Sequence, residues 1–217
     1  MNSSSGLPVM AESSTGARAG GPTPASQIST RASGPTPASQ ISTRHAAVLI
    51  VLSDHPDPEI LYTVRAQHLS HHAGETSFPG GGKEPGESPE ETALREAWEE
   101  VRLDPDAVEI QGRLESRSTQ RFKFNVDPII GRVRDIDRVK RSLLADPKEV
   151  DQIHWVRASA LANPINRGTW RFSGRSGPAF KVEDLLIWGL TAGMTSELLP
   201  LLGWDQPWDP SRHIPLS

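Results

Sequence analysis

Short apolar blocks separated by polar turns run along most of the chain, and they predict strands more often than helices. Residues 46–52 form an apolar run that contains β-branched side chains, which is typical of a buried strand. Residues 60–64 repeat this pattern after a turn rich in Asp and Pro, so they predict the returning strand. Further strands are expected over residues 108–114, 126–133 and 152–156.

The clearest helix signal follows a long loop over residues 66–88, which contains several Gly and Pro residues. Ser88 and Glu91 have the spacing of a capping box, with proline at the first helical position, so we expect a helix from there to about Leu103. A last helix is expected over residues 182–202. Strands mixed with two or three helices predict an α/β sandwich rather than a barrel or a doubly wound sheet.

The start of the chain differs from the rest of its 217 residues. The first 45 residues contain no Phe, Trp or Tyr, and the sequence of residues 21–31 recurs unchanged at residues 34–44. Such a stretch buries too little apolar surface to offset its loss of conformational entropy, so residues 1–45 are expected to be a disordered tail. The chain then divides into this tail, a domain over residues 46–204 and a C-terminal tail over residues 205–217.

Composition and charge exclude several classes of protein. The chain has no Cys, which excludes a disulfide scaffold, a thiolate nucleophile and a Cys-based zinc site. A net charge of −4 argues against a nucleic-acid partner, and no apolar run approaches the ~18 residues of a membrane span. The first residues are rich in hydroxyls and poor in acids, as in transit peptides, but their Gly and Pro content opposes an amphipathic helix. We expect a cytoplasmic protein, with organellar import through the tail as the alternative.

Three glutamates of the first predicted helix share one face. Glu96, Glu99 and Glu100 stand at i, i+3 and i+4, and Glu87 adds a carboxylate just before the helix. The opposite face is apolar and carries Leu94, Ala97, Trp98 and Val101. Like charges at this spacing repel, and we expect no Lys or Arg on that face to offset them. Such a cluster is either a solvated acidic surface or a site for a hard divalent cation, and we favour Mg²⁺ or Mn²⁺.

Glycines lie shortly before this helix. Residues 78–82 read Phe-Pro-Gly-Gly-Gly, and glycines let backbone carbonyls and amides come close to a metal or a phosphate. Together with the helix, this stretch resembles the Nudix box, G-x5-E-x7-R-E-U-x-E-E-x-G-U, where U is aliphatic. The matching glycine and polar positions are Gly81, Glu87, Arg95, Glu96, Glu99 and Glu100. Arg102 replaces the final glycine of the pattern, so the loop after the helix is expected to differ.

A second stretch resembles one branch of the Nudix family in particular. Residues 61–81 are similar to the motif L-L-T-x-R-[SA]-x3-R-x3-G-x3-F-P-G-G, which precedes the box in coenzyme A diphosphatases. The matching positions are Thr63, Arg65, Ala66, Gly74, Phe78, Pro79, Gly80 and Gly81. Ser70 stands in place of an arginine. The resemblance covers most of residues 46–200, and it implies a Nudix-type α/β/α sandwich with a mixed β-sheet. It also implies hydrolysis of coenzyme A or acyl-CoA to 3′,5′-ADP and 4′-phosphopantetheine.

The resemblance also implies roles for the residues of the box. Glu96 and Glu100 are expected to be the main metal ligands, and Glu99 is expected to be a further ligand or a base on a metal-bound water. Glu87 is expected to pair with Arg95 and so hold the loop against the helix.

Residues outside the box each have two interpretations. Arg65 is expected to bind a substrate phosphate or to pair with a local acid, and a carbonyl of Gly80 or Gly81 can complete the coordination of the metal. Glu149 is an additional ligand or base from a later loop, or a solvated carboxylate. Three histidines lie close together in the loop: His68, His71 and His72. For these imidazoles we favour substrate contact or exposure to solvent over zinc binding.

Two alternatives to a coenzyme A diphosphatase stay open. The sequence of residues 82–88 is of a kind common in Nudix proteins that act on nucleoside triphosphates or sugar nucleotides. Another nucleotide, such as ADP-ribose, a dinucleotide or a deoxynucleoside triphosphate, is therefore an alternative substrate. A silent Nudix module that only binds nucleotides or partners is the third reading, although such modules usually lose a carboxylate of the box. The protein is expected to be a monomer or a homodimer.

Overall fold

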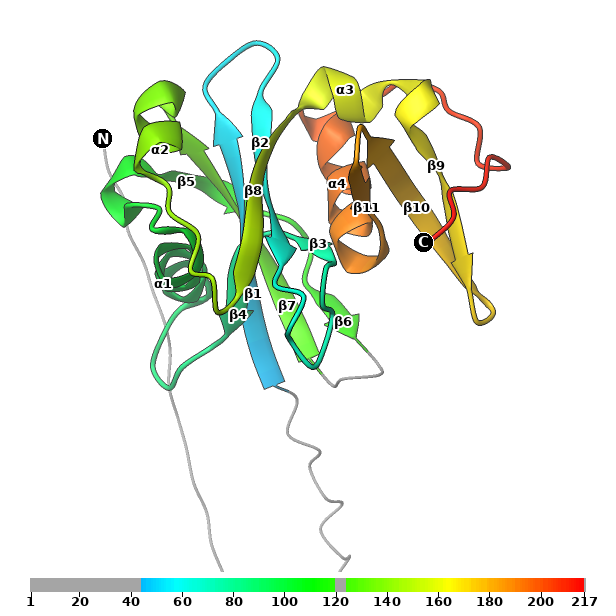
Figure 1. Cartoon of the computed structure of the whole chain (residues 1–217). Coiled ribbons are helices and arrows are strands. Elements are labelled where there is room, and N and C mark those ends of the chain that lie inside the picture. The colour runs from blue at the N-terminus through cyan, green and yellow to red at the C-terminus, as the bar shows by residue number, and fades with distance from the viewer. Residues whose placement is uncertain (1–43, 120–123, 217) are drawn as a thin grey trace, which may run out of the picture. The chain divides into compact units, whose positions relative to one another are not determined.

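The structure is a computed structural model, and it describes residues 44–119 and 124–216 (Figure 1). The predicted disordered tail lies outside the described residues, except for its last two positions, which begin the first strand. The strands are β1 (Arg44–Ser53), β2 (Glu59–Arg65), β3 (Thr76–Ser77), β4 (Gly80–Gly82), β5 (Glu109–Arg113), β6 (Arg117–Thr119), β7 (Phe124–Val133), β8 (Val150–Arg157), β9 (Arg167–Phe172), β10 (Arg175–Val182) and β11 (Leu185–Ile187). The helices are α1 (Pro89–Val101), α2 (Ile136–Ser142), α3 (Ala158–Ala162) and α4 (Gly189–Leu201), with 3-10 turns at Pro105–Ala107 and Pro164–Asn166.

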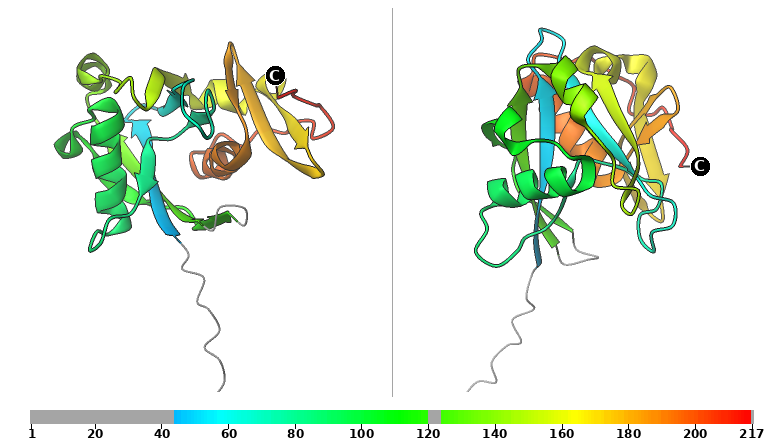
Figure 2. Two further views of the ribbon diagram at one scale, coloured as in Figure 1. Left: turned by 60° about the horizontal axis from the view of Figure 1, so that its bottom comes forward. Right: turned by 60° about the vertical axis from the view of Figure 1, so that its left-hand side comes forward.

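A mixed sheet forms the centre of the fold. β1 pairs with β7 in parallel and with β2 and β4 in antiparallel orientation, and the main path through the sheet is β3-β2-β1-β7-β5. Because side chains alternate along a strand, β1 presents Leu49 and Val51 to one face and Ile50 and Leu52 to the other, and all four are buried. Figure 2 shows the layers, with α1 on one side of β1 and α4 on the other. The predicted sandwich with a mixed sheet is confirmed.

Helix α1 covers one face of the sheet with small and branched side chains. Ala97 and Val101 are fully buried and belong to the same hydrophobic cluster as Leu49. Trp98, which we expected on the packed face, is 45% exposed, so that prediction is wrong. The ring lies at the edge of the packed face, where the Arg102 guanidinium stacks on it at 5.6 Å from the ring centroid.

Helix α4 packs on the other face of the sheet. Met194 and Leu198 are buried in one cluster with Ile50 and Tyr62. The Tyr62 hydroxyl, which comes from β2, is hydrogen-bonded to Thr195 Oγ1 of α4 at 2.9 Å. The apolar contacts and this one buried hydrogen bond together attach the helix to the sheet.

The segment before α4 differs from the prediction. The helix expected over residues 182–202 begins only at Gly189. The preceding residues form β10 and β11, which pair through Lys181 and Leu186 in a second sheet of order β11-β10-β9. Glu183, with a φ of 52°, lies in the tight turn between them. This hairpin depends on pairing between strands rather than on a local period, and the sequence did not reveal the second sheet or the helices α2 and α3.

The C-terminal residues run along β9. The Ile214 N–H donates to the Thr169 carbonyl at 3.0 Å, and the Thr169 N–H donates to the Arg212 carbonyl at 2.8 Å. Ile214 is buried. The predicted C-terminal tail over residues 205–217 therefore contacts the domain in its described part, and its boundary stays a prediction.

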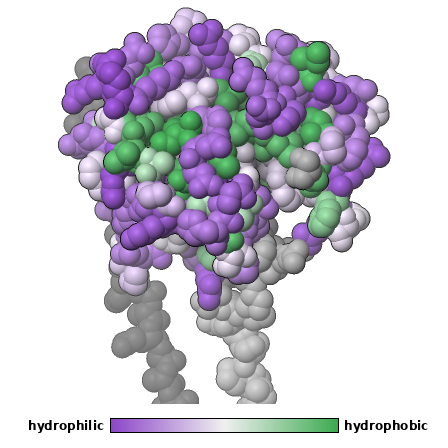
Figure 3. Space-filling model, in the orientation of Figure 1, coloured by the Kyte–Doolittle hydropathy of each residue, from purple (hydrophilic) through white to green (hydrophobic). Residues whose placement is uncertain are grey.

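The face of the molecule seen in Figure 3 is mostly hydrophilic. Figure 3 shows hydrophilic residues over most of one face, with hydrophobic residues gathered toward its middle. The most exposed large apolar side chains come from different elements and are Leu144, Ile165, Phe172 and Leu201. In the part of the chain that the structure describes, no helix is long and apolar enough to cross a bilayer.

Candidate active site

A capping box starts α1 where the sequence predicts it. The Glu91 N–H donates to Ser88 Oγ at 3.1 Å, and the Ser88 N–H donates to the Glu91 carboxylate at 2.7 Å. The helix ends at Val101, two residues before the predicted Leu103. Arg102 then takes a left-handed conformation (φ 57°, ψ 31°), the conformation that glycine adopts most readily. Arg102 therefore ends the helix with the backbone conformation expected of the final glycine of the Nudix box.

Strand β4 consists of glycines and lies against both β1 and α1. A Cβ atom on Gly80 would lie 2.4 Å from the Ala47 carbonyl oxygen, and one on Gly81 would lie 2.5 Å from the Glu96 carboxyl carbon. Both distances are shorter than van der Waals contact. At Gly80 the clash is with the backbone of β1, so only glycine fits there, whereas a side chain at Gly81 would require the Glu96 carboxyl group to shift. The backbone of β4 consequently borders the carboxylates, as the sequence predicts.

Glu100 is a carboxylate buried at the centre of the site. Its side chain is 3% exposed, and its oxygens lie 3.9 Å from Arg65 Nη1 and 3.3 Å from the Gly80 N–H, which donates to it. Burial raises the pKa of Glu100 to about 8; Arg65 and the Gly80 N–H lower this pKa, while Glu149 and Glu96 raise it. The positive charge of Arg65 is therefore not sufficient to offset the burial of the Glu100 carboxylate.

Glu96 and Glu149 add negative charge beside Glu100. Burial raises the pKa of Glu96, Arg95 lowers it, and the charges of Glu99 and Glu149 raise it further. Glu149 comes from the segment between α2 and β8 and therefore reaches the site from a distant part of the sequence. The structure brings together the predicted pair of glutamates and the later carboxylate.

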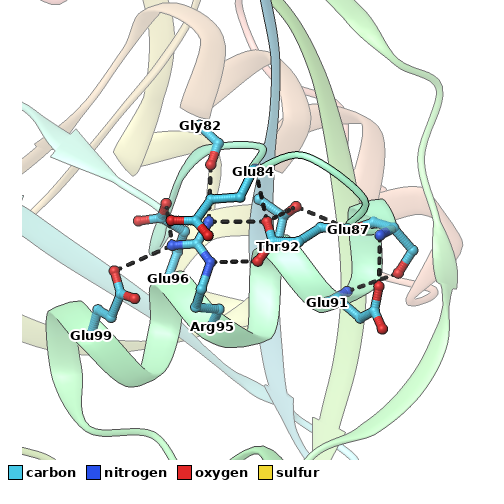
Figure 4. Close-up of polar contacts among 9 residues, drawn as sticks. Gly82, Glu84, Glu87, Glu91, Thr92, Arg95, Glu96 and Glu99 are labelled. Carbon is cyan, nitrogen blue, oxygen red and sulfur yellow. Dashed lines mark hydrogen bonds and ion pairs between the residues drawn. The ribbon is translucent and has the colours of Figure 1, made fainter.

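Arg95 connects the loop, the strand and the helix, as Figure 4 shows. Its Nε donates to Glu87 at 2.6 Å and its Nη2 donates to the Gly82 carbonyl at 2.9 Å. Its Nη1 donates to Glu96 at 2.9 Å and to Glu99 at 3.2 Å. The predicted pair of Glu87 and Arg95 is confirmed, whereas the expectation that no cation offsets the repulsion on this face is wrong. The i, i+4 spacing of Arg95 and Glu99 could have revealed this ion pair from the sequence.

Two contacts of the loop were missed from the sequence. Thr92 Oγ1 donates to Glu87 at 2.9 Å, and the Gly82 carbonyl accepts from Arg95. Arg95 and Thr92 hydrogen bonds, together with the Glu84 N–H, lower the pKa of Glu87 to about 2. Glu87 is therefore an ionised anchor for the loop rather than a group that exchanges protons near neutral pH.

Comparison with known proteins identifies the family. Residues 43–173 match the model of the NUDIX domain. The chain belongs to the Nudix family. It is 33% identical over 165 residues to Nudix hydrolase 3 from Caenorhabditis elegans, an alignment that covers 67% of this chain and 68% of that protein. It is 36% identical over 160 residues to the uncharacterized Nudix hydrolase NudL from Yersinia enterocolitica, which covers 71% of this chain and 79% of that protein.

The fold agrees with this assignment. RenU, a Nudix hydrolase from M. smegmatis, has a crystal structure that matches with a TM-score of 0.51 at 18% sequence identity. The match covers 74% of this chain and 87% of RenU, and at this identity it shows the shared fold. This chain is thus a Nudix hydrolase, and members of the family use divalent metal ions and act on small nucleotide-derived substrates.

The carboxylates of this Nudix hydrolase fit a small divalent cation. Glu100 is buried with little compensating charge, and the Glu96 carboxyl group lies directly against the backbone of Gly81. Desolvated carboxylates beside backbone oxygens are the ligand chemistry that Mg²⁺ and Mn²⁺ prefer. Within residues 44–119 and 124–216, no three Asp, Glu or His side chains already form a complete ligand group. Glu96 and Glu100 can hold the ion, and Arg95 would have to release Glu99 before that residue joined them.

The histidine cluster does not converge on a common point. His68 Nε2 lies 3.1 Å from the Lys148 carbonyl, and His72 Nδ1 lies 2.8 Å from a Glu75 carboxylate oxygen. His71 is exposed. His68 and His72 therefore point to different partners.

Proposed function

We propose that this Nudix hydrolase splits the diphosphate of coenzyme A or acyl-CoA, producing 3′,5′-ADP and (acyl-)4′-phosphopantetheine with Mg²⁺ or Mn²⁺. The observation that carries the proposal is the position of Arg65, the arginine of the upstream motif, at 3.9 Å from Glu100. The stretch that resembles coenzyme A diphosphatases and the Nudix box thus meet at one point. The side chain of Arg65 is 27% exposed, so its guanidinium can also contact a substrate from solvent.

Other residues of the upstream motif support the position of Arg65. The Gly74 N–H donates to the Arg65 carbonyl at 2.9 Å, and Gly74 has a φ of 71°, which glycine adopts without strain. The Phe78 ring stacks on the buried Tyr62 ring at 4.9 Å between centroids. The motif therefore shapes the loop that leads from Arg65 to the glycines of β4.

The chain's own groups have separate tasks in the proposed reaction. Glu96 and Glu100 would hold the ion, with a carbonyl of Gly80 or Gly81 as a further oxygen ligand. When bound, Mg²⁺ or Mn²⁺ neutralises the charge of the diphosphate and acidifies water. Arg65 offers its planar set of N–H donors to the diphosphate, which no single ammonium group can match.

A base is needed to take the proton from the attacking water. Glu99 and Glu149 are the two candidates. Glu99 accepts a hydrogen bond from Arg95, which occupies one of its carboxylate oxygens. Glu149 is exposed and has no such partner among the described residues, yet its charge acts on both Glu96 and Glu100. We favour Glu149 as the base and Glu99 as an additional ligand.

A second nucleotide substrate is the alternative, and two observations favour it. Ser70 replaces an arginine of the upstream motif, and it is exposed on the loop. Residues 82–88 have a sequence common in Nudix enzymes that act on nucleoside triphosphates or sugar nucleotides. The choice between substrates depends on loops outside the box rather than on the glutamates.

One assay panel tests the proposal. The purified protein is incubated with Mg²⁺ or Mn²⁺ and coenzyme A, acyl-CoA, ADP-ribose, NADH or a deoxynucleoside triphosphate, and the products are separated by chromatography. We expect 3′,5′-ADP from the first two substrates at the highest kcat/KM. Faster cleavage of another substrate would overturn the assignment to coenzyme A, and tight binding without turnover at any metal concentration would favour a silent module. Size-exclusion chromatography and cell fractionation test the expected monomer or homodimer and its cytoplasmic location.

A further inference from the structure

The turn that follows Arg65 holds the segment that carries Glu149. The Ala66 N–H donates to the Glu149 carbonyl at 2.9 Å, directly beside a shift in the pairing of β2 with β8 between Val64 and Arg65. Bulges of this kind commonly lie beside active sites, where they re-aim a side chain. Arg65 and Glu149 are therefore set by the same irregularity in the backbone.

Two side chains add to this backbone contact. The Gln67 N–H donates to Asp151 Oδ2 at 3.0 Å, and His68 Nε2 lies 3.1 Å from the Lys148 carbonyl. A carbonyl only accepts, so His68 is the donor in the second bond. The three consecutive residues 66–68 thus contact residues on both sides of Glu149 as well as Glu149 itself.

The opposite side of the segment is attached to α1. The Asp146 N–H donates to the Glu100 carbonyl at 2.8 Å, and the Glu149 N–H donates back to the Asp146 carbonyl at 3.0 Å. Lys148 N–H donates to Asp146 Oδ1 at 3.0 Å. The short loop is consequently held between the helix that carries the metal-site glutamates and the turn that follows Arg65.

We propose that His68 and Asp151 are positioning residues that hold the segment carrying Glu149 against the helix of the metal-site glutamates, and so fix the place of the Glu149 side chain. The inference rests on the proposed function, in which Glu149 takes the proton from water. The proposal also gives His68 a role that it does not give His72, because His72 is hydrogen-bonded within its own loop. His68 and Asp151 touch neither the substrate nor the ion in this proposal, and they act through Glu149 alone.

A double-mutant cycle tests the coupling. We compare the wild type with His68→Ala, Glu149→Gln and the double variant, and measure kcat and KM for the best substrate of the panel. Because a misplaced group lowers the rate of the chemical step, His68→Ala is expected to lower kcat about tenfold and to leave KM within about twofold. In the Glu149→Gln background the same change is expected to have less than about a twofold effect. Losses that multiply in the double variant would overturn the proposal.

Three further variants sharpen the cycle. His68→Gln keeps an N–H donor near the position of Nε2 and is expected to recover most of the lost kcat, whereas Asp151→Ala is expected to reproduce the defect of His68→Ala. His55→Ala is the matched control, since His55 is an exposed histidine in the turn between β1 and β2. A His68→Gln variant as slow as His68→Ala, or a control as slow, would contradict a specific hydrogen bond to Lys148.

Hydrogen exchange gives a readout that does not depend on catalysis. The Ala66 and Gln67 amides donate to Glu149 and Asp151, so both are expected to exchange faster in His68→Ala than in the wild type. Unchanged exchange would show that His68 does not hold the segment. If the wild type cleaves a nucleotide other than coenzyme A, the substrate assignment fails while the cycle still tests the positioning. If it cleaves none, the exchange experiment alone decides the positioning role.

Discussion

Helices α1 and α4 have the same length, 13 residues, and pack on opposite faces of the same sheet, but they are built in different ways. A capping box, a proline at the first position and an acidic first turn specify the start of α1 locally. Helix α4 has no side chain that caps its N-terminus, and it contains Pro200 in its last turn. Local signals therefore define α1, whereas burial defines α4.

The difference extends to what each helix can do. Only one side of α1 packs, so its other side can bring glutamates to the glycine strand β4. The buried residues of α4 lie along one side of the helix, in one apolar cluster with residues of the central sheet and of β10. The only carboxylate of α4, Glu197, forms an ion pair with Arg117, and we therefore assign catalysis to α1 and stability to α4.

The largest expected effect separates the two helices by activity. Glu100→Gln should lower kcat/KM by about 10³-fold, because several kcal/mol of charge stabilisation are lost and each factor of ten costs about 1.4 kcal/mol. The folded protein should remain as stable without metal, since burial raises the pKa of Glu100 and glutamine has nearly the volume of the uncharged acid. Steady-state kinetics with Mg²⁺ and thermal unfolding in EDTA measure the two quantities. Glu90→Gln, in the first turn of the same helix, is the control that should keep full activity, and an active Glu100→Gln would refute the site.

The next effect separates the helices by stability. Leu198→Ala in α4 should lower the free energy of unfolding by about 2–5 kcal/mol, because it leaves a cavity in the core. The kcat of the molecules that remain folded should change little. Urea unfolding and kinetics well below the melting temperature check both statements, with the exposed Leu201→Ala as the matched control. A loss of activity at unchanged stability would contradict the division of tasks.

A smaller effect tests the local specification of α1. Ser88→Ala removes the side chain that accepts from the Glu91 N–H, so the free energy of unfolding should fall by about 1 kcal/mol. Ser88→Asp keeps an acceptor at the cap and should stay close to the wild type. Denaturant unfolding of the three proteins measures the difference. Equal stability of all three would mean that packing on the sheet, rather than the cap, sets the start of α1.

An effect of similar size, which shrinks at high pH, concerns the hydrogen bond that attaches α4 to β2. Tyr62→Phe should cost about 1 kcal/mol at neutral pH, because Thr195 loses a buried partner. Burial raises the pKa of Tyr62 above its usual range, so above pH ~10 the unfolded chain ionises and the folded chain does not. The wild type should therefore lose stability as the pH rises through that region, and the gap to Tyr62→Phe should shrink.

Denaturant unfolding below and above pH ~10 measures this gap. Tyr62 is the only tyrosine of the chain, so its phenolate absorbance reports on this residue alone. A gap that widens with pH would show that the folded protein ionises Tyr62 more readily than the unfolded chain does.

Local patterns were sufficient for much of the fold and the site. The strand predicted at residues 46–52 is the centre of β1, and the predicted helix start at Ser88 is confirmed to the residue. The spacing of the box placed Glu96 and Glu100 on one face, because a helix repeats every 3.6 residues. The pairing of Glu87 with Arg95 followed from the resemblance and is present in the structure.

Contacts between distant segments could not be obtained in this way. Strand β11 and the turn before it were predicted as part of a helix, since an apolar run does not reveal whether a strand or a helix buries it. The exposure of Trp98 depends on where the packed face ends, which only the sheet defines. The same holds for Glu149, whose place beside Glu96 and Glu100 depends on the turn after Arg65.

The order of residues along the chain is enough to define α1, its N-cap and the set of carboxylates proposed for a divalent ion, because each of these depends on neighbours within a few positions. The burial that raises the pKa of Glu100, the approach of Arg65 and Glu149, and the sheet that holds α4 come from the folded chain. They require segments far apart in sequence to exclude water together, and no local pattern encodes that.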